Sequence, residues 1–516
     1  MKTIGLCQME KFVASQIIYA VVKTNLDIFV EHIFEEFLDL KLYDHTIVHF
    51  DLKGAAPKPQ YFKEILKLIS ENGATGILIE YEDMFPFSDF FKNAVNDEAY
   101  SKKELKEILN FAKSLNLTII PLIQSFGHLE WILKLPEFRY YRDHDVNNGV
   151  VCIADQEAVS VTVESVFSEI LEFHKEIGIE IVHIGGDEAF NYGQCFPGGV
   201  SKHEFAARYL INVASFVREL TGPSTRVLIW NDMVDQFYGV SSDLTSLLQE
   251  SLELGADGAS RVLVDLDKRL QNNEIWAQRK QEYIPENKFG GLILTGWQRY
   301  DHFSTFCEIL PVAIPSLILN LEISTGLNSS ESINSASKKL KCNFSDVYLL
   351  DSLDTVLPNC GFPGIKAFKK IRSMMDKFSN FWPFFLFQKN HEKSGWFRPY
   401  NRFYKFSNYL YLKNLLSELW ELKSNTVESK NEIEQELEKI LIGTAAKEFV
   451  FDFFGPPLKI LNKMIKDAKE ILEIRTFQKR SFKFDDGYFE ETDGILDGKN
   501  EITITVFLRD HGSDPK

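Results

Sequence analysis

Short apolar runs alternate with amphipathic stretches from residue 45 onward, and this alternation limits the fold more than any other feature. The amphipathic stretches carry apolar residues three and four positions apart, which predicts helices, whereas the short runs are typical of buried strands. Strands that alternate with helices form parallel sheets, so we expect an α/β fold, a TIM-type (β/α) barrel. The expected strands are 47–52, 76–81, 117–124, 179–185, 226–231 and 290–297, and the expected helices between them include 61–71, 102–114, 159–177 and 203–219.

The pattern changes after residue 325, where strand-like runs end and long amphipathic stretches at 404–441 and 458–474 predict a helical C-terminal domain. The aromatic patch at 378–387 is interpreted as inter-domain core rather than as a partner surface. We therefore expect four parts. They are an N-terminal extension at 1–44, the catalytic barrel at 45–325, the helical domain at 326–476 and a polar tail at 477–516.

The segment between the fifth and the last expected strand is short for an eight-stranded barrel. Residues 232–289 separate these strands, 58 in all. The helix after strand five and two whole βα units, at roughly 30 residues each, would need about 75. The stretches 247–256 and 266–279 predict helix, and 262–265 is the single short run of β character. We therefore expect a barrel that is incomplete between strands five and eight.

The charge of the chain bears on its partners. The net charge of −17 is spread over 516 residues without an acidic block, which makes nucleic acid and anionic membrane unfavourable partners. The apolar stretch at 12–22 contains Ser15 and Gln16 and is too short to cross a bilayer, so it is interpreted as neither a signal peptide nor a membrane span. A homodimer is compatible with the sequence.

The six cysteines are far apart and lack Cys-x-x-Cys spacing. This predicts reduced thiols and no zinc site, which fits a cytoplasmic or nuclear location. No phosphate-cradling glycine-rich loop is present, and we expect no cofactor and no metal.

Polar side chains follow the expected strands at their carboxyl ends, which converge on one pocket in a barrel. Each of them alone would more simply be a helix cap or a buried hydrogen-bonding group. Together, carboxylates that accept from sugar hydroxyls and indoles that stack on sugar C–H surfaces predict a polyhydroxylated ligand. Asp187 and Glu188 are the candidate chemical centre, and the candidate binding residues are Asp51, Glu80, Glu82, His128, His183, Trp230, Asp232, Trp297 and Asp301.

The segment 183–188 reads His-Ile-Gly-Gly-Asp-Glu and resembles the signature of the family 20 glycoside hydrolases, the β-N-acetylhexosaminidases. Segments 49–55, 76–86, 120–130 and 292–302 extend the resemblance. It implies removal of terminal GlcNAc or GalNAc by a retaining mechanism in which the 2-acetamido oxygen of the substrate attacks the anomeric carbon. The resemblance assigns Glu188 as general acid and base and Asp187 as the residue that orients the acetamido group.

An adjacent Asp-Glu pair suits this mechanism, because a conventional retaining enzyme needs two carboxyl groups on opposite sides of the scissile bond. Repulsion within the pair is expected to keep Glu188 protonated while Asp187 stays ionised. His128 and His183 are interpreted as groups that orient these carboxylates rather than as bases or metal ligands.

The short segment between strands five and eight favours an alternative, and two residues also depart from the family pattern. Lys53 stands nearest the place of an arginine that grips ring hydroxyls in relatives. A tyrosine that holds the acetamido oxygen has only Tyr238 and Tyr283 as candidates in the short segment, and neither follows a credible strand. The alternative function is therefore a sugar-binding protein of the same fold with little or no catalytic activity.

Overall fold

The computed structural model describes residues 42–199, 201–230, 232–233, 249–251, 253–254, 272–278, 290–341, 360–374, 395–477 and 479. The chain divides into two compact units. The first contains the described residues up to Ile365 together with Glu438–Ala445, and the second contains Lys366–Leu437 and the described residues from Ala446 onward. The predicted domain boundaries at residues 44, 325 and 476 stay predictions.

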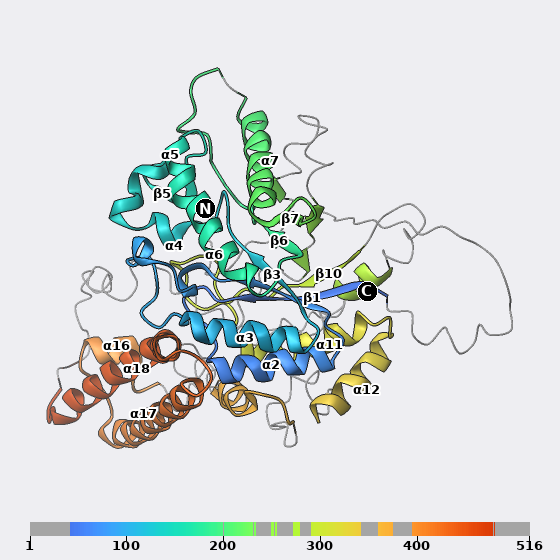
Figure 1. The fold of residues 1–516 in the computed structure, drawn as a ribbon. Helices are drawn as coiled ribbons and strands as arrows, with labels where there is room; N and C mark the ends of the chain where they lie inside the picture. Colours follow the sequence, from blue (N-terminus) through green and yellow to red (C-terminus); the bar gives the residue numbers. More distant parts are fainter. Residues whose placement is uncertain are drawn as a thin grey trace, which may run out of the picture. The chain divides into compact units, whose positions relative to one another are not determined.

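A parallel sheet forms the centre of the first unit (Figure 1). Its strand order is β8-β7-β6-β3-β2-β1-β10-β9, and every neighbouring pair is parallel. All six predicted strands are present, each within a few residues of its expected bounds. They are β1 (His45–Asp51), β2 (Gly76–Glu80), β3 (Thr118–Leu122), β6 (Ile181–His183), β7 (Arg226–Trp230) and β10 (Gly291–Leu294).

The predicted helices between these strands are present as well. Helix α3 (Lys102–Ser114) has its predicted bounds because a capping box starts it: the Ser101 side chain accepts from the Glu104 N–H, and the Glu104 carboxylate accepts from the Ser101 N–H. The helix predicted at 159–177 opens with a π-helical turn, η4 (Ser160–Glu164), before α6. The other helices of this set are α2 (Pro59–Glu71), α5 (Gln156–Val159), α6 (Ser165–Lys175) and α7 (Lys202–Thr221).

The strands bury one shared apolar cluster, which fixes their register. Its members come from β1, β2, β3, β6, β7 and β10 and are Ile47, Leu78, Ile120, Leu122, Ile181, Trp230 and Ile293. Because successive side chains of a strand point to opposite faces, a slip of one residue would turn these apolar groups out of the cluster. The cluster therefore also fixes which polar residues stand at the strand ends.

The helix predicted at 247–256 was wrong. This stretch holds two short strands, β8 (Gln249–Ser251) and β9 (Glu253–Leu254). β8 pairs with β7 and β9 pairs with β10, so pairing with the strand edges on either side outweighs the local helix propensity. Residues 272–278 are helical, within the stretch predicted at 266–279. Tyr238, Tyr283, the run 262–265 and the patch 378–387 lie outside the described residues.

Smaller elements that the sequence did not indicate connect β2, β3 and β6. They are η1 (Glu82–Met84), η2 (Asp89–Phe91), α4 (Glu130–Leu133), η3 (Pro136–Tyr141) and an antiparallel hairpin of β4 (Arg142–His144) and β5 (Asn147–Val151). They extend the carboxyl ends of the strands, where the candidate pocket is expected.

Helices α11 (Leu310–Ile323) and α12 (Ser329–Leu340) follow β10 in the first unit. The second unit contains α16 (Pro399–Phe403), α17 (Tyr409–Leu437) and most of α18 (Gly443–Glu473). A separate apolar core joins these last two helices, with Leu412, Leu419, Leu461 and Ala468 among its buried members. Among the described residues, none of the helices is long and apolar enough to cross a membrane.

The prediction of reduced cysteines was wrong for the four cysteines that the structure describes. Cys152, directly after β5, and Cys195, between β6 and α7, form a disulfide, and Cys307 and Cys360 are also disulfide-bonded. Cys152 and Cys195 are separated by 43 residues, so their approach depends on the tertiary fold, which sequence spacing does not reveal. Disulfides persist mainly in oxidising compartments. The cytoplasmic or nuclear location therefore loses its supporting argument and stays a prediction.

Candidate active site

Asp187 and Glu188 follow β6 directly, after two glycines that the local geometry requires. Gly185 and Gly186 have φ values of 61° and 84°, a region that favours glycine. A Cβ atom on Gly185 would lie 2.0 Å from the Gln124 Oε1 atom, so a larger residue would force Gln124 to shift. The glycine pair thus brings the two carboxylates to the carboxyl end of the sheet, as the sequence predicted.

Asp232 holds the backbone of Glu188. Glu188 has a φ of 42°, which is costly for a residue other than glycine, and its N–H donates to the Asp232 Oδ2 atom at 2.9 Å. Burial raises the pKa of the Asp232 carboxyl to about 6. Its Oδ1 atom is buried and has no hydrogen-bond partner among the described residues. Asp232, predicted as a sugar ligand, therefore first supports the conformation of Glu188.

His128 bridges the two carboxylates. Its Nε2 atom lies 3.5 Å from the Asp187 Oδ2 atom and 3.3 Å from the Glu188 Oε2 atom. Burial alone would lower the pKa of His128, but the charges of Asp187 and Glu188 outweigh burial and hold it well above its usual value. The imidazole is therefore a cation that donates to the pair, and its orienting role stays a prediction.

The pKa order of Asp187 and Glu188 in the unliganded site is the reverse of the predicted order. Burial raises the pKa of Asp187 well above its usual value, although the His128 cation opposes this. Burial also favours a higher pKa for Glu188, but hydrogen bonds from His128 and Tyr300 outweigh it and hold that pKa below its usual value. When the pair holds a single proton, that proton therefore lies on Asp187. Adjacency in the sequence showed the repulsion but not the donors that decide which carboxylate is ionised.

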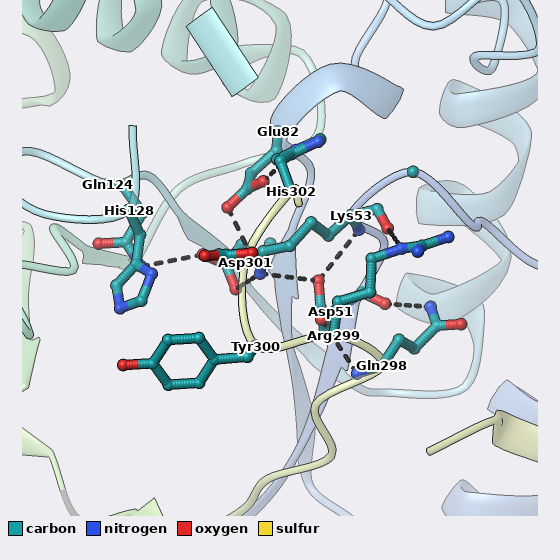
Figure 2. Close-up of polar contacts among 12 residues, drawn as sticks. Asp51, Lys53, Glu82, Gln124, His128, Gln298, Arg299, Tyr300, Asp301 and His302 are labelled. Atoms are coloured by element: carbon teal, nitrogen blue, oxygen red, sulfur yellow. Dashed lines mark hydrogen bonds and ion pairs between the residues drawn. The ribbon is translucent and has the colours of Figure 1, made fainter. Parts of the chain in front are cut away.

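Tyr300 is a site residue that the sequence reasoning missed. It lies in the turn after β10, and its hydroxyl donates to the Glu188 Oε2 atom at 3.0 Å. Figure 2 shows its ring on the same side of the site as His128, and the two ring centroids are 6.2 Å apart. The run after β10 was recognised as polar, but Asp301 was selected from it. The Asp301 side chain instead accepts from the N–H groups of Phe303 and Ser304 at 2.8 Å and stabilises the turn.

Lys53 is the centre of a second polar cluster (Figure 2). Its Nζ atom lies 3.3 Å from Asp51, 3.6 Å from Glu80 and 3.4 Å from Glu82, and the side chain is 1% exposed. Burial alone would lower the pKa of Lys53, but the three carboxylates raise it well above its usual value. Lys53 is therefore a buried cation paired with protein groups, which contrasts with the sugar contact expected of an arginine in this place.

Two of the predicted sugar ligands in this cluster are already bound by the protein. The Asp51 Oδ2 atom accepts from the Gln298 N–H at 3.0 Å, and the Glu80 Oε1 atom accepts from the Gln124 side chain at 2.9 Å. Both carboxylates are almost fully buried. The Glu82 Oε2 atom also lies 2.5 Å from the His302 Nε2 atom. The role of Asp51 and Glu80 as sugar ligands stays a prediction.

Trp230 and Trp297 belong to an aromatic row that crosses four strand ends. His183 packs against Trp230 at 4.3 Å, Trp230 lies 6.3 Å from Trp297, and Trp297 packs against His49 at 4.5 Å, all between ring centroids. The His183 Nδ1 atom accepts from the Gly185 N–H at 3.0 Å, so this imidazole supports the glycine pair. The Trp230 Nε1 atom is buried without a hydrogen-bond partner among the described residues.

Comparisons with known proteins show the family of the chain. Residues 65–248 match the family described as glycosyl hydrolase family 20, catalytic domain. The chain is 30% identical to human hexosaminidase D over 483 aligned positions, which cover 83% of this chain and 95% of the human protein. The chain belongs to family 20 of the glycosyl hydrolases. It is a glycoside hydrolase of the β-hexosaminidase type.

Other relatives agree with the family assignment. Bovine hexosaminidase D is 35% identical over 320 positions, which cover 54% of this chain and 90% of the bovine protein. Among solved structures, that of the pneumococcal virulence factor StrH has a TM-score of 0.43 at 15% identity and covers 62% of this chain and 90% of its own. This likeness is too distant to add to the assignment.

The human alignment also has a length difference. The alignment runs over 483 positions, but only 83% of the 516 residues of this chain, fewer than 483, take part in it. The human protein therefore has residues at several tens of aligned positions where this chain has none.

Within the described part of the family 20 chain, no group of three or more His, Cys, Asp or Glu side chains is arranged to hold a metal ion.

Proposed function

We propose that this family 20 chain is an exo-β-N-acetylhexosaminidase that removes terminal GlcNAc or GalNAc with retention of the anomeric configuration. The observation that carries the proposal is the carboxylate pair at the end of β6, with His128 within 3.5 Å of Asp187 and of Glu188. The hexosaminidases D of human and cattle supply the substrate class. Two carboxyl groups that contact the same imidazole titrate as a coupled pair, so one proton can be shared between them.

The proposed reaction uses the substrate as its own nucleophile. The acetamido oxygen attacks the anomeric carbon, the glycosidic C–O bond breaks, and Glu188 gives its proton to the leaving oxygen. Asp187 accepts a hydrogen bond from the acetamido N–H and stabilises the positive charge of the cyclic intermediate. Water then attacks the anomeric carbon and gives a proton to Glu188, and the acetamido group re-forms.

Substrate binding is proposed to move the resting proton from Asp187 to Glu188. A hydrogen bond from the acetamido N–H favours the charged form of Asp187, and an aglycone that covers Glu188 disfavours its charged form. The side chain of Glu188 is 31% exposed and that of Asp187 is 13% exposed, so an aglycone has more surface of Glu188 to cover. The reversed pKa order of the unliganded site is then compatible with the chemistry.

The pocket is proposed to hold the sugar through three buried polar atoms and the tryptophans. Asp187 Oδ1, Trp230 Nε1 and Asp232 Oδ1 are buried and have no hydrogen-bond partner among the described residues. Buried polar groups are rarely left unpaired, so these atoms are suited to bind substrate amide and hydroxyl groups. Trp297 offers a second indole face beside Trp230.

We also propose that the barrel is shorter than in the human relative between β7 and β10. Two observations support this: the 58 residues available, and the pairing of the neighbouring short strands β8 and β9 with β7 and β10. The carboxylate pair and its partners keep their contacts in this chain, so the inactive sugar-binding alternative gains no support from the site.

The purified full chain should hydrolyse 4-nitrophenyl β-glycosides of GlcNAc or GalNAc. The matched control is 4-nitrophenyl β-glucoside, which lacks the acetamido nucleophile and should not be hydrolysed. A thiazoline mimic of the cyclic intermediate should inhibit competitively. Binding of the thiazoline without turnover of either N-acetyl substrate would favour the sugar-binding alternative, and equal turnover of the glucoside would reject the proposed mechanism.

A further inference from the structure

Two donors converge on one oxygen of Glu188. The Tyr300 hydroxyl lies 3.0 Å from the Oε2 atom, and the His128 Nε2 atom lies 3.3 Å from the same oxygen. Burial raises the pKa of Tyr300, and the neighbouring Glu188 raises it further, so the phenol is neutral and donates. Among the described residues, no hydrogen bond or ion pair reaches the Glu188 Oε1 atom.

We infer that Tyr300 is a positioning residue for the general acid: together with His128 it occupies Oε2, so that Oε1 carries the proton toward the leaving oxygen. This inference rests on the proposed function and deepens it. If His128 and Tyr300 could bind either oxygen of Glu188, the carboxyl proton could lie on either oxygen. Fixing one oxygen leaves a single productive orientation.

The turn after β10 has the rigidity that this role requires. The buried Arg299 side chain donates to the Lys53 carbonyl at 3.0 Å and to the Ser304 carbonyl at 3.1 Å, and its guanidinium lies 4.2 Å from the Phe306 ring centroid. The Tyr300 N–H donates to the Ser304 hydroxyl at 2.9 Å. Tyr300 is 42% exposed, yet its backbone is anchored on both sides, so little conformational freedom is lost when its hydroxyl binds Glu188.

Tyr300 also favours the charge that develops on Glu188 during catalysis. When Glu188 gives up its proton, the new carboxylate is already paired with two donors, which lowers the barrier to proton transfer. The benefit depends on the leaving group, because a good leaving group needs little help from an acid. Poor leaving groups should therefore show the dependence on Tyr300 most clearly.

Tyr300→Phe is the direct test, since it removes the hydroxyl and keeps the ring. We expect kcat/KM for a disaccharide to fall about 10-fold, as for the loss of one hydrogen bond to a charged group, and to change much less for a dinitrophenyl glycoside. Loss of this donor raises the pKa of Glu188, which holds the proton in the proposed enzyme–substrate complex, so the alkaline limb of the kcat profile should move to higher pH. Tyr140→Phe is the matched control, because Tyr140 is 89% exposed and should behave as the unmodified protein.

A second readout separates this inference from the proposed function. In protein labelled with ¹³C at glutamate carboxyl carbons, the Glu188 resonance is the one absent from Glu188→Gln, and Tyr300→Phe should shift its titration to higher pH even if no substrate is turned over. An unchanged titration, or an equal loss of rate for all leaving groups with an unchanged pH profile, would overturn the role of Tyr300. Absence of turnover in the unmodified chain would count against the proposed function alone.

Discussion

Glu188→Gln is expected to lower kcat for a disaccharide substrate by about 10² to 10⁴, the range for loss of a general acid. Glutamine keeps the shape of the side chain and its place beside His128 and Tyr300, but it has no proton to give to the leaving oxygen. The loss should shrink for dinitrophenyl glycosides, which leave without protonation. Steady-state kinetics over a series of leaving groups measures both effects.

Substrate binding serves as the control for Glu188→Gln. The affinity for the thiazoline inhibitor should stay close to that of the unmodified chain, because Asp187 and the tryptophans remain in place. Near-normal turnover of the disaccharide by the variant would show that Glu188 is not the proton donor.

Asp187→Asn should reduce kcat/KM on the order of 10² to 10³, the scale for losing one group that stabilises developing charge. The asparagine can no longer balance the positive cyclic intermediate, and this defect applies to every leaving group. The loss should therefore be similar for disaccharides and dinitrophenyl glycosides, unlike that of Glu188→Gln. Kinetics on the same substrate series separates the two roles, and a loss confined to poor leaving groups would contradict the role given to Asp187.

The pH profile gives a second test of Asp187→Asn. Burial raises the pKa of Asp187, so the pair retains one proton to higher pH than ordinary carboxyl groups, and kcat/KM should fall as the pH rises through that raised pKa. In the variant the proton must reside on Glu188, whose pKa is held low by His128 and Tyr300. The alkaline limb should therefore move to lower pH. A move to higher pH would mean that Asp187 does not share the proton.

Much of the first unit could be predicted from its sequence because local patterns determine it. Apolar runs of strand length and helical periodicity predicted the six strands and the helices between them. The position of Asp187 and Glu188 at a strand end followed from the same pattern, because the carboxyl ends of parallel strands meet at one edge. His128 was identified on the same grounds.

The remaining features depend on contacts between residues far apart in the chain. Tyr300 contacts Glu188 from a turn that Arg299 anchors to Lys53, a link across 246 residues. The Cys152–Cys195 disulfide and the pairing of β8 and β9 likewise arise from tertiary proximity. Asp51 and Glu80 were predicted as sugar ligands because a sequence shows residue type, whereas their burial and protein partners appear only in the fold.

The acetamido oxygen of the substrate is the nucleophile of the proposed reaction at Asp187 and Glu188, so its basicity should control the rate. Aryl glycosides that carry N-acetyl, N-fluoroacetyl, N-difluoroacetyl and N-trifluoroacetyl groups change this basicity and keep the ring and the leaving group constant. We expect kcat/KM to fall with each added fluorine, by on the order of 10² across the series, or about 3 kcal/mol in activation free energy. A rate independent of fluorine content would contradict the substrate-assisted mechanism and indicate a carboxylate nucleophile.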